Sequence, residues 1–421
     1  MRAPYQVISA DSHLEISANR WRDRVPEKYR DNAPKTIRLP DGSDAWQTED
    51  GRIHLVNGAS TLCAGKPFEE WRQEGAQYDT AAGAGSPEQR LREQDEDGVD
   101  AEVFYPSVNG SGVLHGIRND DAYHVVLRAY NTWVAEEYCG VAPDRLIGLG
   151  VIPQRGVKEA IAEMEHCAKL GFKGVWIGKF PNGKMRPSPQ DDEFWSAALS
   201  LDMPVTAHEN FIDHGPKERA ASPDGPSGPR RVVDGKEATG HPADLAQRIC
   251  GYGVRSAEVA CRLVIDGVFE RFPTLQIYMA ENQLGWIPNW LEQMDIIWGR
   301  QHFVLERVQG LKRLERPPSD YVRSNTLWGF MDNPLGVRMR HEIGVDRVMW
   351  GSDFPHQPTD WPHSYETIQR NMVGVPADEQ HQMLVGNVTR FFHMGDTFES
   401  TEERERQVAA RRTASAVPAS V

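Results

Sequence analysis

Short apolar runs rich in β-branched residues alternate with longer stretches of helical periodicity along most of the chain. Such alternation is typical of βα units that assemble into a parallel sheet. From Val157 to Ala168, for example, apolar residues recur at three- and four-residue steps before Gly171, which predicts one exterior helix. We expect strands at residues 6–11, 101–106, 146–153, 174–179, 204–210, 276–282, 324–330 and 347–353.

Eight strands of this kind favour an α/β fold, a (β/α)8 barrel of the TIM type that occupies residues 1–394. A doubly wound parallel sheet is the competing architecture. Most of the strands end in a polar or proline-containing turn, as the functional face of a barrel requires. Further helices are expected at residues 120–138, 191–201, 243–272 and 288–308, of which the last two are long and interrupted by Gly.

Two insertions and a tail interrupt this pattern. The segment of about residues 14–98, after the first strand, predicts a lid, and its Glu49-Asp50-Gly51 turn between two strand-like runs predicts a hairpin. A second insertion at residues 213–240, after the fifth strand, is rich in Gly and Pro and predicts a mobile loop over the active face. Residues 395–421 lack a sustained apolar pattern, so we expect a tail that is disordered or packs on a partner subunit.

Charge and cysteine content narrow the functional classes. A net charge of −14, with no Lys/Arg-rich run, argues against a nucleic-acid-binding surface. No stretch approaches the roughly 18 apolar residues that a membrane helix needs, and the N-terminal residues lack the apolar core of a signal peptide. The five cysteines form no C-x-x-C pair, which indicates a reducing compartment. We therefore predict a cytoplasmic protein that binds neither nucleic acid nor membrane.

The expected strand ends carry a consistent set of polar side chains. Because residues two apart in a strand point to the same side, Asp11 and His13 can converge on one ion. Imidazole and carboxylate groups together suit Zn²⁺, Mn²⁺ or Fe²⁺ better than Ca²⁺ or Mg²⁺. The alternative makes Asp353 a turn cap and the others unrelated core residues, but each buried polar group then needs its own partner. The candidate metal ligands at the strand ends are Asp11, His13, His208, Asp353 and either Glu281 or Asn282.

Residues near the same strand ends are candidates for substrate binding. Aromatic side chains there could form a flat apolar pocket, although packing between barrel and helices explains them equally well. Lys179 and Arg118 are candidate partners for a substrate carboxylate, and His214 and His356 are placed to assist proton transfer. The candidate set is Trp176, Lys179, Asn210, His214, Asn282, Trp286, Trp328 and His356, with Phe211 and Trp361 as further aromatic members.

Six short motifs are specific in combination. They are Asp11-x-His13, Gly98-Val99-Asp100-Ala101-Glu102-Val103-x-Tyr105-Pro106, Gly171-Phe172-Lys173-Gly174, Arg271-Phe272-Pro273-x-Leu275, Gly285-Trp286-x-Pro288-x-Trp290-Leu291-Glu292-x-x-Asp295 and Gly351-Ser352-Asp353-x-Pro355. Together, over roughly residues 5–394, they resemble the amidohydrolase-related family. That family includes aminocarboxymuconate-semialdehyde decarboxylase and the resorcylate and carboxyvanillate decarboxylases.

The resemblance implies a distorted (β/α)8 barrel with one divalent metal ion, Zn²⁺ as the first expectation and Mn²⁺ or Fe²⁺ as alternatives. Asp11 stands where the family's first-strand His is commonest, while His13 and His208 match two further ligands. Asp353 matches the acid/base aspartate, and Asp353 and His208 are the catalytic candidates. The family's sixth-strand His is replaced here. Glu281 and Asn282 compete for its place, and we favour Glu281 because its charge would complete the site.

Two reaction classes use the same residues. The first is hydrolysis of a C–N or C–C bond in a small aromatic or unsaturated substrate by metal-bound water, with Asp353 as general base. The alternative is non-oxidative decarboxylation of an aromatic or unsaturated acid, with Asp353 protonating the carbon that loses carbon dioxide. A barrel that binds metal or ligand without catalysis is a third option. A homodimer through the 288–308 helix is one possible assembly, and core packing of that helix is its alternative.

Overall fold

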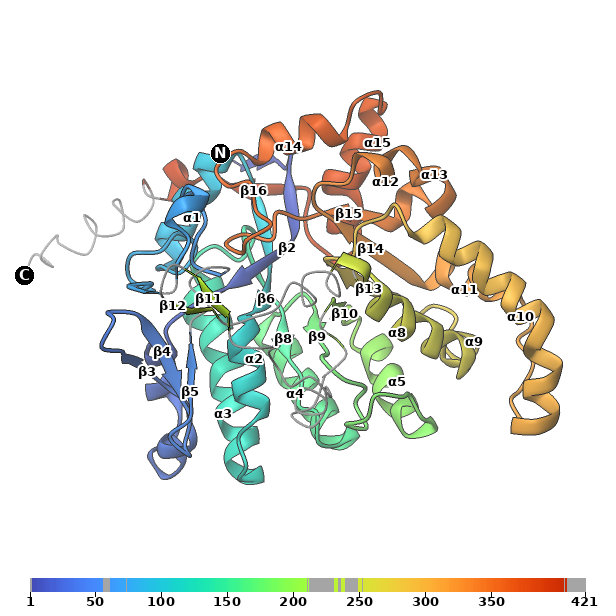
Figure 1. The fold of residues 1–421 in the computed structure, drawn as a ribbon, viewed down its shortest axis with the longest axis horizontal. Helices are drawn as coiled ribbons and strands as arrows, with labels where there is room; N and C mark the ends of the chain where they lie inside the picture. The colour runs from blue at the N-terminus through green and yellow to red at the C-terminus, as the bar shows by residue number, and fades with distance from the viewer. Residues whose placement is uncertain are drawn as a thin grey trace, which may run out of the picture.

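Parallel strands run around a central ring in the computed structural model of the chain (Figure 1). The structure describes residues 2–55, 61–72, 74–209, 211, 231–233, 236–238, 249–251, 253–404 and 406. One sheet has the strand order β2-β6-β7 and another the order β15-β14-β13-β10-β9-β8. Their bounds are β2 (Ile8–Leu14), β6 (Ala101–Pro106), β7 (Leu146–Gly148), β8 (Gly150–Val151), β9 (Val175–Trp176), β10 (Val205–His208), β13 (Ile277–Ala280), β14 (Thr326–Phe330) and β15 (Val348–Trp350).

Two junctions close these sheets into a barrel. β7 and β8 are one strand interrupted at Leu149, whose N–H still donates to the Phe104 carbonyl at 3.2 Å. On the other side, the turn after β15 joins β2, because the Asp353 N–H donates to the Asp11 carbonyl and the His13 N–H donates to the Phe354 carbonyl, both at 2.8 Å. The predicted α/β barrel of the TIM type is thus confirmed, and each of the eight expected runs contains one strand position.

Helices pack around the outside of this ring (Figure 1). The expected 243–272 stretch is interrupted by glycine as predicted: within its described part, α8 (Val254–Ile265) and α9 (Val268–Arg271) are separate helices. Gly267, with a φ of 69°, adopts the left-handed conformation between them and ends the first helix. The other main helices are α1 (Pro87–Asp97), α2 (Val108–His115), α3 (Asp120–Trp133), α4 (Val157–Leu170), α5 (Asp192–Ser200), α10 (Ile287–Gln309), α11 (Pro318–Asn325), α14 (Ser364–Asn371) and α15 (Ala377–His381).

The segment between β2 and β6 contains the expected hairpin. Its strands β4 (Asp44–Gln47) and β5 (Ile53–Leu55) pair in antiparallel register around Gly51, and β3 (Lys35–Arg38), which the sequence pattern does not predict, pairs with the other edge of β4. This small sheet lies beside α2 and α3 in Figure 1. The last part of the segment is α1, which leads directly into β6.

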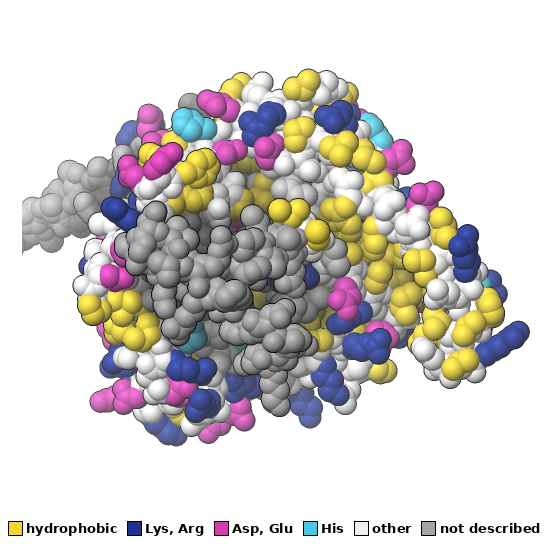
Figure 2. Space-filling model, in the orientation of Figure 1, with side chains coloured by type: hydrophobic (Ala, Val, Ile, Leu, Met, Phe, Trp, Pro, Cys, Tyr) yellow, Lys and Arg dark blue, Asp and Glu magenta, His cyan; other side chains and the backbone are white. Residues whose placement is uncertain are grey.

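Most of the second expected insertion lies outside the described residues. Within it, β11 (Arg231–Val233) and β12 (Lys236–Ala238) pair in antiparallel register. In the C-terminal segment, β16 (Thr397–Glu399) pairs with β1 (Arg2–Pro4), so residues 397–399 of the expected tail are an ordered part of this same chain. No helix in the described parts of the chain is long and apolar enough to cross a membrane. On the face shown in Figure 2, basic and acidic side chains are interspersed around the periphery.

Candidate functional site

The turn after β15 brings a buried carboxylate to the C-terminal ends of the strands. Gly351 starts this turn, and a β-carbon there would lie 2.6 Å from the Cβ of Asp11, so only glycine permits this approach to β2. Asp353 itself has a φ of 54°, a left-handed conformation that is costly for a residue with a side chain. Such strain persists only where the surrounding structure enforces it, and it is concentrated at functional sites.

Strands β2 and β10 supply two imidazoles and a second carboxylate beside Asp353. The His13 Nε2 atom lies 3.1 Å from Asp353 Oδ1 and 3.8 Å from Asp11 Oδ1. The His208 Nε2 atom lies 3.6 Å from Asp11 Oδ1. β2 continues through Asp11 and His13 to Leu14 instead of ending at Asp11, because an irregular register lets it follow β6 further. The structure therefore brings together four of the five predicted ligands from three separate strands.

The donor atoms of this cluster are suited to a cation. Asp11 Oδ1 and Oδ2, His13 Nε2, His208 Nε2 and Asp353 Oδ1 are all buried, and none has a partner in hydrogen-bonding geometry among the described residues. The ligand atoms of Asp11, His13 and His208 lie within 4.8 Å of one another. Burying carboxylates without compensating charge costs several kcal/mol per ion. A divalent cation would offset this cost, so the donor set fits one.

Glu281 and Asn282, the two candidates from the sixth barrel strand, point differently. Glu281 Oε2 lies 3.5 Å from His208 Nε2, whereas the Asn282 side chain turns back and its Nδ2 donates to the Ala280 carbonyl. Glu281 also has a left-handed φ of 57°. It lies beside His208 but outside both groups of three residues whose ligand atoms all lie within 4.8 Å, so its ligation stays a prediction.

A second group consists of His13, Asp353 and His356. The His356 ring stacks on the His13 ring with centroids 3.8 Å apart, and its Nδ1 lies 3.2 Å from Asp353 Oδ1. Its other nitrogen, Nε2, lies 3.0 Å from Glu15 Oε1, and the Ser107 hydroxyl donates to Glu15 Oε2 at 2.8 Å. Glu15 is not among the residues predicted from the sequence. It could have been found from its spacing, because Asp11, His13 and Glu15 are two positions apart and Glu15 continues the same face directly after β2.

The electrostatics of the site reflect its excess of carboxylates. Burial alone would lower the pKa values of His208 and His356, but Asp11 raises the first to about 9 and Asp353 raises the second to about 10. Burial alone would raise the pKa of Asp353, yet His356 and His13 together hold it below its usual range. Burial, followed by the charge of Asp353, raises the pKa of Glu281 well above its usual range. The cluster thus draws positive charge, as protons or as a cation.

The remaining predicted residues are dispersed. Trp176 is buried at the end of β9, and its ring centroid lies 6.0 Å from that of His115 in α2. Trp328 of β14 instead packs against Trp286 and Trp290 of the α10 region, with centroids 5.5 and 5.8 Å away, in a barrel–helix contact. Substrate binding by these side chains remains a prediction.

The polar candidates for substrate binding and Phe211 lie in different parts of the chain. Arg118 pairs with Asp50 in the first insertion, at 2.8 Å, and its contact with a substrate carboxylate stays a prediction. Lys179 is half-buried just after β9. Asn210 and His214 lie outside the described residues. Phe211 packs against Phe180, and the two ring centroids are 5.0 Å apart.

Comparisons with known proteins agree with this architecture. A family model described as Amidohydrolase matches residues 49–394. A gamma-resorcylate decarboxylase from Polaromonas sp. is 25% identical over 288 residues, which cover 65% of this chain and 78% of that protein. The crystal structure of an amidohydrolase from Mycobacterium avium subsp. paratuberculosis superposes with a TM-score of 0.70 at 16% identity, covering 92% of this chain and 99% of that one.

A third similar protein is the 5-carboxyvanillate decarboxylase from Novosphingobium aromaticivorans, solved with manganese and 4-hydroxy-3-methoxy-5-nitrobenzoic acid. It superposes with a TM-score of 0.65 at 19% identity and covers 93% of this chain and 96% of its own. These structural likenesses establish the shared barrel. Because the family model spans well over half of its length, this chain belongs to the amidohydrolase family.

Proposed function

We propose that the protein is a metal-dependent decarboxylase that removes carbon dioxide from a small aromatic or unsaturated carboxylic acid. The observation that carries the proposal is the position of Asp353, a buried carboxylate 3.1 Å from His13 in a cluster of cation-binding side chains. The relatives that act on resorcylate and carboxyvanillate support decarboxylation better than hydrolysis, the reaction that the sequence alone placed first.

We assign Asp11, His13, His208 and Asp353 as the residues that would hold one divalent ion, with Glu281 beside them. When bound, such an ion supplies positive charge that binds and orients the substrate's carboxylate and a neighbouring oxygen. The manganese bound to the carboxyvanillate enzyme supports Mn²⁺ as the first choice here. Zinc, the first expectation from the sequence, has no specific support.

Proton transfer falls to Asp353 and His356. The Asp353 carboxylate, which is ionised at rest, takes a proton from His356 and passes it to the carbon that bears the substrate's carboxylate, which forms a C–H bond. The bond to the carboxylate carbon then breaks, its electron pair returns to the unsaturated system, and carbon dioxide leaves. His356, held between Asp353 and Glu15, is placed to return a proton to Asp353. Burial of all three groups keeps bulk water from competing for this proton.

The proposed function also includes a role for the first insertion in substrate entry. We assign the segment between β2 and β6 to the substrate entrance, because His115 of its neighbour α2 approaches Trp176 at the end of β9. Residues 213–240, expected from the sequence to be a loop over the same face, lie mostly outside the described residues. A small-molecule substrate follows from the relatives that were solved with aromatic ligands. The cytoplasmic location and the homodimer remain predictions.

Isotope labelling distinguishes the two reactions. We expect the wild-type protein with Mn²⁺, given a panel of hydroxy-substituted aromatic acids in D₂O, to yield a product that has lost carbon dioxide and gained one deuterium on carbon. In H₂¹⁸O, the organic product should contain no ¹⁸O. Mass spectrometry of the organic product measures both. Incorporation of ¹⁸O into that product would show hydrolysis instead.

Glu15→Gln tests the partner of His356. The amide can still occupy the space but provides no negative charge to the His356 ring, so we expect kcat to fall by about 10-fold, as for outer-shell partners of metal sites. The KM for the aromatic acid should change little, because Glu15 lies behind His356. Steady-state kinetics separate the two constants. Exposed Glu69→Gln serves as the control, and equal kcat values for both variants would remove Glu15 from the mechanism.

A further inference from the structure

We propose that Arg90, in helix α1 outside the barrel, is a positioning residue that sets the spacing between the Asp11–His13 segment and Asp353. The role rests on the proposed function, because Arg90 acts through that function's metal ligands and acid/base. The Arg90 side chain is 1% exposed although it carries a permanent charge. A charge is buried in this way only where the fold pairs it with suitable acceptors, so the partners of Arg90 show which segments it holds in place.

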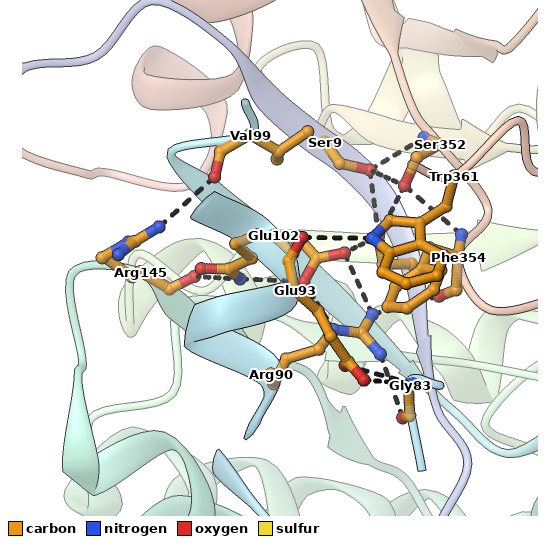
Figure 3. A network of polar contacts seen from close by, with 12 residues as sticks. Ser9, Gly83, Arg90, Glu93, Val99, Glu102, Arg145, Ser352, Phe354 and Trp361 are labelled. Atoms are coloured by element: carbon orange, nitrogen blue, oxygen red, sulfur yellow. Dashed lines mark hydrogen bonds and ion pairs between the residues drawn. The ribbon is translucent and has the colours of Figure 1, made fainter. Parts of the chain in front are cut away.

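All three nitrogens of the Arg90 guanidinium donate hydrogen bonds (Figure 3). Its Nε and Nη2 donate to the two oxygens of Glu102 at 2.6 and 3.0 Å, a bidentate pair. Nη1 donates to the Gly83 carbonyl, and Nη2 also donates to the Phe354 carbonyl, each at 3.1 Å. The rings of Phe354 and Phe104 lie 4.3 and 4.9 Å from the guanidinium carbon. A planar fork with donors in fixed directions is therefore required here.

One arm of this network reaches β2. Glu102, the partner of Arg90, accepts a hydrogen bond from the Ser12 hydroxyl at 2.8 Å. Ser12 lies between Asp11 and His13 and points to the opposite side of the strand. The same hydroxyl lies 3.1 Å from the Ser352 hydroxyl, next to Asp353 in the chain. The Arg90–Glu102 pair thus fixes the back of the strand whose front carries two metal ligands.

The other arm reaches the turn that carries Asp353. The Phe354 carbonyl accepts from Arg90 and also from the His13 backbone N–H, at 2.8 Å. In return, the Asp353 N–H donates to the Asp11 carbonyl. Arg90 therefore holds the shared acceptor through which β2 and the turn are joined. Because Asp353 has a left-handed φ, its turn needs such an external restraint to keep its geometry.

The network also ties the first insertion to the site. The Gly83 N–H donates to both oxygens of Glu93, each at 3.1 Å, and Trp361 Nε1 donates to the Glu93 carbonyl at 3.1 Å. The Trp361 ring stacks on Phe354 with centroids 5.1 Å apart. Residues of the first insertion and of the segment after β15, far apart in the sequence, thus surround Arg90 (Figure 3). The insertion consequently supports the Asp353 turn as well as lying beside the barrel.

A buried ion pair that served stability alone would have no effect on the metal site. Arg340 in α13 (Arg340–Ile343) offers a matched comparison, because it is also buried and its Nε donates to Glu379 Oε2 at 2.5 Å. Its Nη1 donates to the Val337 carbonyl at 3.1 Å. None of its described contacts involves the metal ligands, β2 or the Asp353 turn. Arg340→Lys therefore reports the cost of weakening a buried pair elsewhere.

The test compares Arg90→Lys, Ser12→Ala and Arg340→Lys in the full chain, with Mn²⁺ alone as the probe. Lysine keeps the charge beside Glu102 but cannot also hold the Phe354 carbonyl, and alanine removes the link from Glu102 to β2. We expect Arg90→Lys and Ser12→Ala to weaken Mn²⁺ binding about 10-fold by calorimetry. The electron paramagnetic resonance spectrum of their bound Mn²⁺ should change. Arg340→Lys should lower the Tm but retain wild-type affinity and spectrum.

Wild-type Mn²⁺ affinity and spectrum in both Arg90→Lys and Ser12→Ala would overturn the proposal. If Arg90→Lys does not fold, Ser12→Ala decides by the same two measurements. A loss of affinity in Arg340→Lys equal to that in Arg90→Lys would also count against it, since the effect would then be a general one. A wild-type chain that binds no Mn²⁺ would instead overturn the proposed metal site itself, and with it this role for Arg90.

Discussion

Asp353→Asn is expected to lower kcat for carbon dioxide release about 1,000-fold, because proton transfer by a positioned side chain contributes a factor of this order. Asparagine is nearly isosteric with aspartate and tolerates the left-handed backbone at this position. Its amide cannot give the proton that the substrate carbon requires. Release of carbon dioxide from the best aromatic acid of the panel, followed by mass spectrometry, measures the effect.

Metal analysis must accompany this variant, because Asp353 is assigned both as ligand and as acid. Retained metal with lost turnover would assign the loss to proton transfer, whereas loss of both would make ligation the larger role. Asp378→Asn in α15, which changes an exposed carboxylate, is the control. Unchanged metal content and turnover in Asp353→Asn would remove this residue from the mechanism. A wild-type protein that binds metal but converts no acid or amide would favour the non-catalytic barrel.

The barrel could be predicted because its strands are buried on both faces. Such strands appear in the sequence as continuous apolar runs, as residues 348–350 do. The position of Asp353 could also be predicted from the sequence, since a carboxylate directly after a buried strand of a parallel barrel lies at the functional rim. Strand limits were less accurate. The irregular register of β2 carries it past Asp11 to Leu14, and such bulges depend on the neighbouring strand, which a single sequence does not reveal.

Four residues that the structure brings together, Asp11, His13, His208 and Asp353, could be predicted from their positions at strand ends, whereas other contacts of the cluster were missed or left open. Glu15 extends the alternation of Asp11 and His13 and could have been found from it. Glu281 and Asn282 could not be separated by counting, because left-handed conformations at Glu281 and Gln283 determine which side chain faces His208. An aromatic residue such as Trp328 looks the same in a pocket and in a barrel–helix contact.

Arg90 illustrates what a single sequence cannot show. Its helix has ordinary sequence signals, with Ser86 as the N-cap and Gly98 as the C-cap. Nothing in this local pattern distinguishes Arg90 from the solvated arginines of other helices. Its partner Phe354 lies 264 positions away along the chain. Only the closed barrel brings the two together, so the importance of Arg90 is a property of the tertiary structure.

Removal of the divalent metal by a chelator is expected to lower kcat/KM about 1,000-fold. The charge that a metal supplies in such sites is worth several kcal/mol, and about 4 kcal/mol corresponds to roughly this factor. Without it, the buried carboxylates of Asp11 and Asp353 lose their compensating charge, and Glu281 is held in its protonated form, so the Tm should also fall. Added Mn²⁺ should restore both quantities, and metal analysis should find close to one ion per chain.

His208→Ala provides the decisive comparison, because chelation alone does not show where the ion binds. His208 lies 3.6 Å from Asp11 and is the imidazole that β10 contributes to the cluster. Its loss should prevent Mn²⁺ from restoring activity or Tm at concentrations that restore the wild type. His363→Ala removes an exposed imidazole and should leave both unaffected. Full restoration of the His208→Ala variant by the same Mn²⁺ concentration would place the ion elsewhere. The cluster would then contain buried charges whose compensation comes from protons on its histidines.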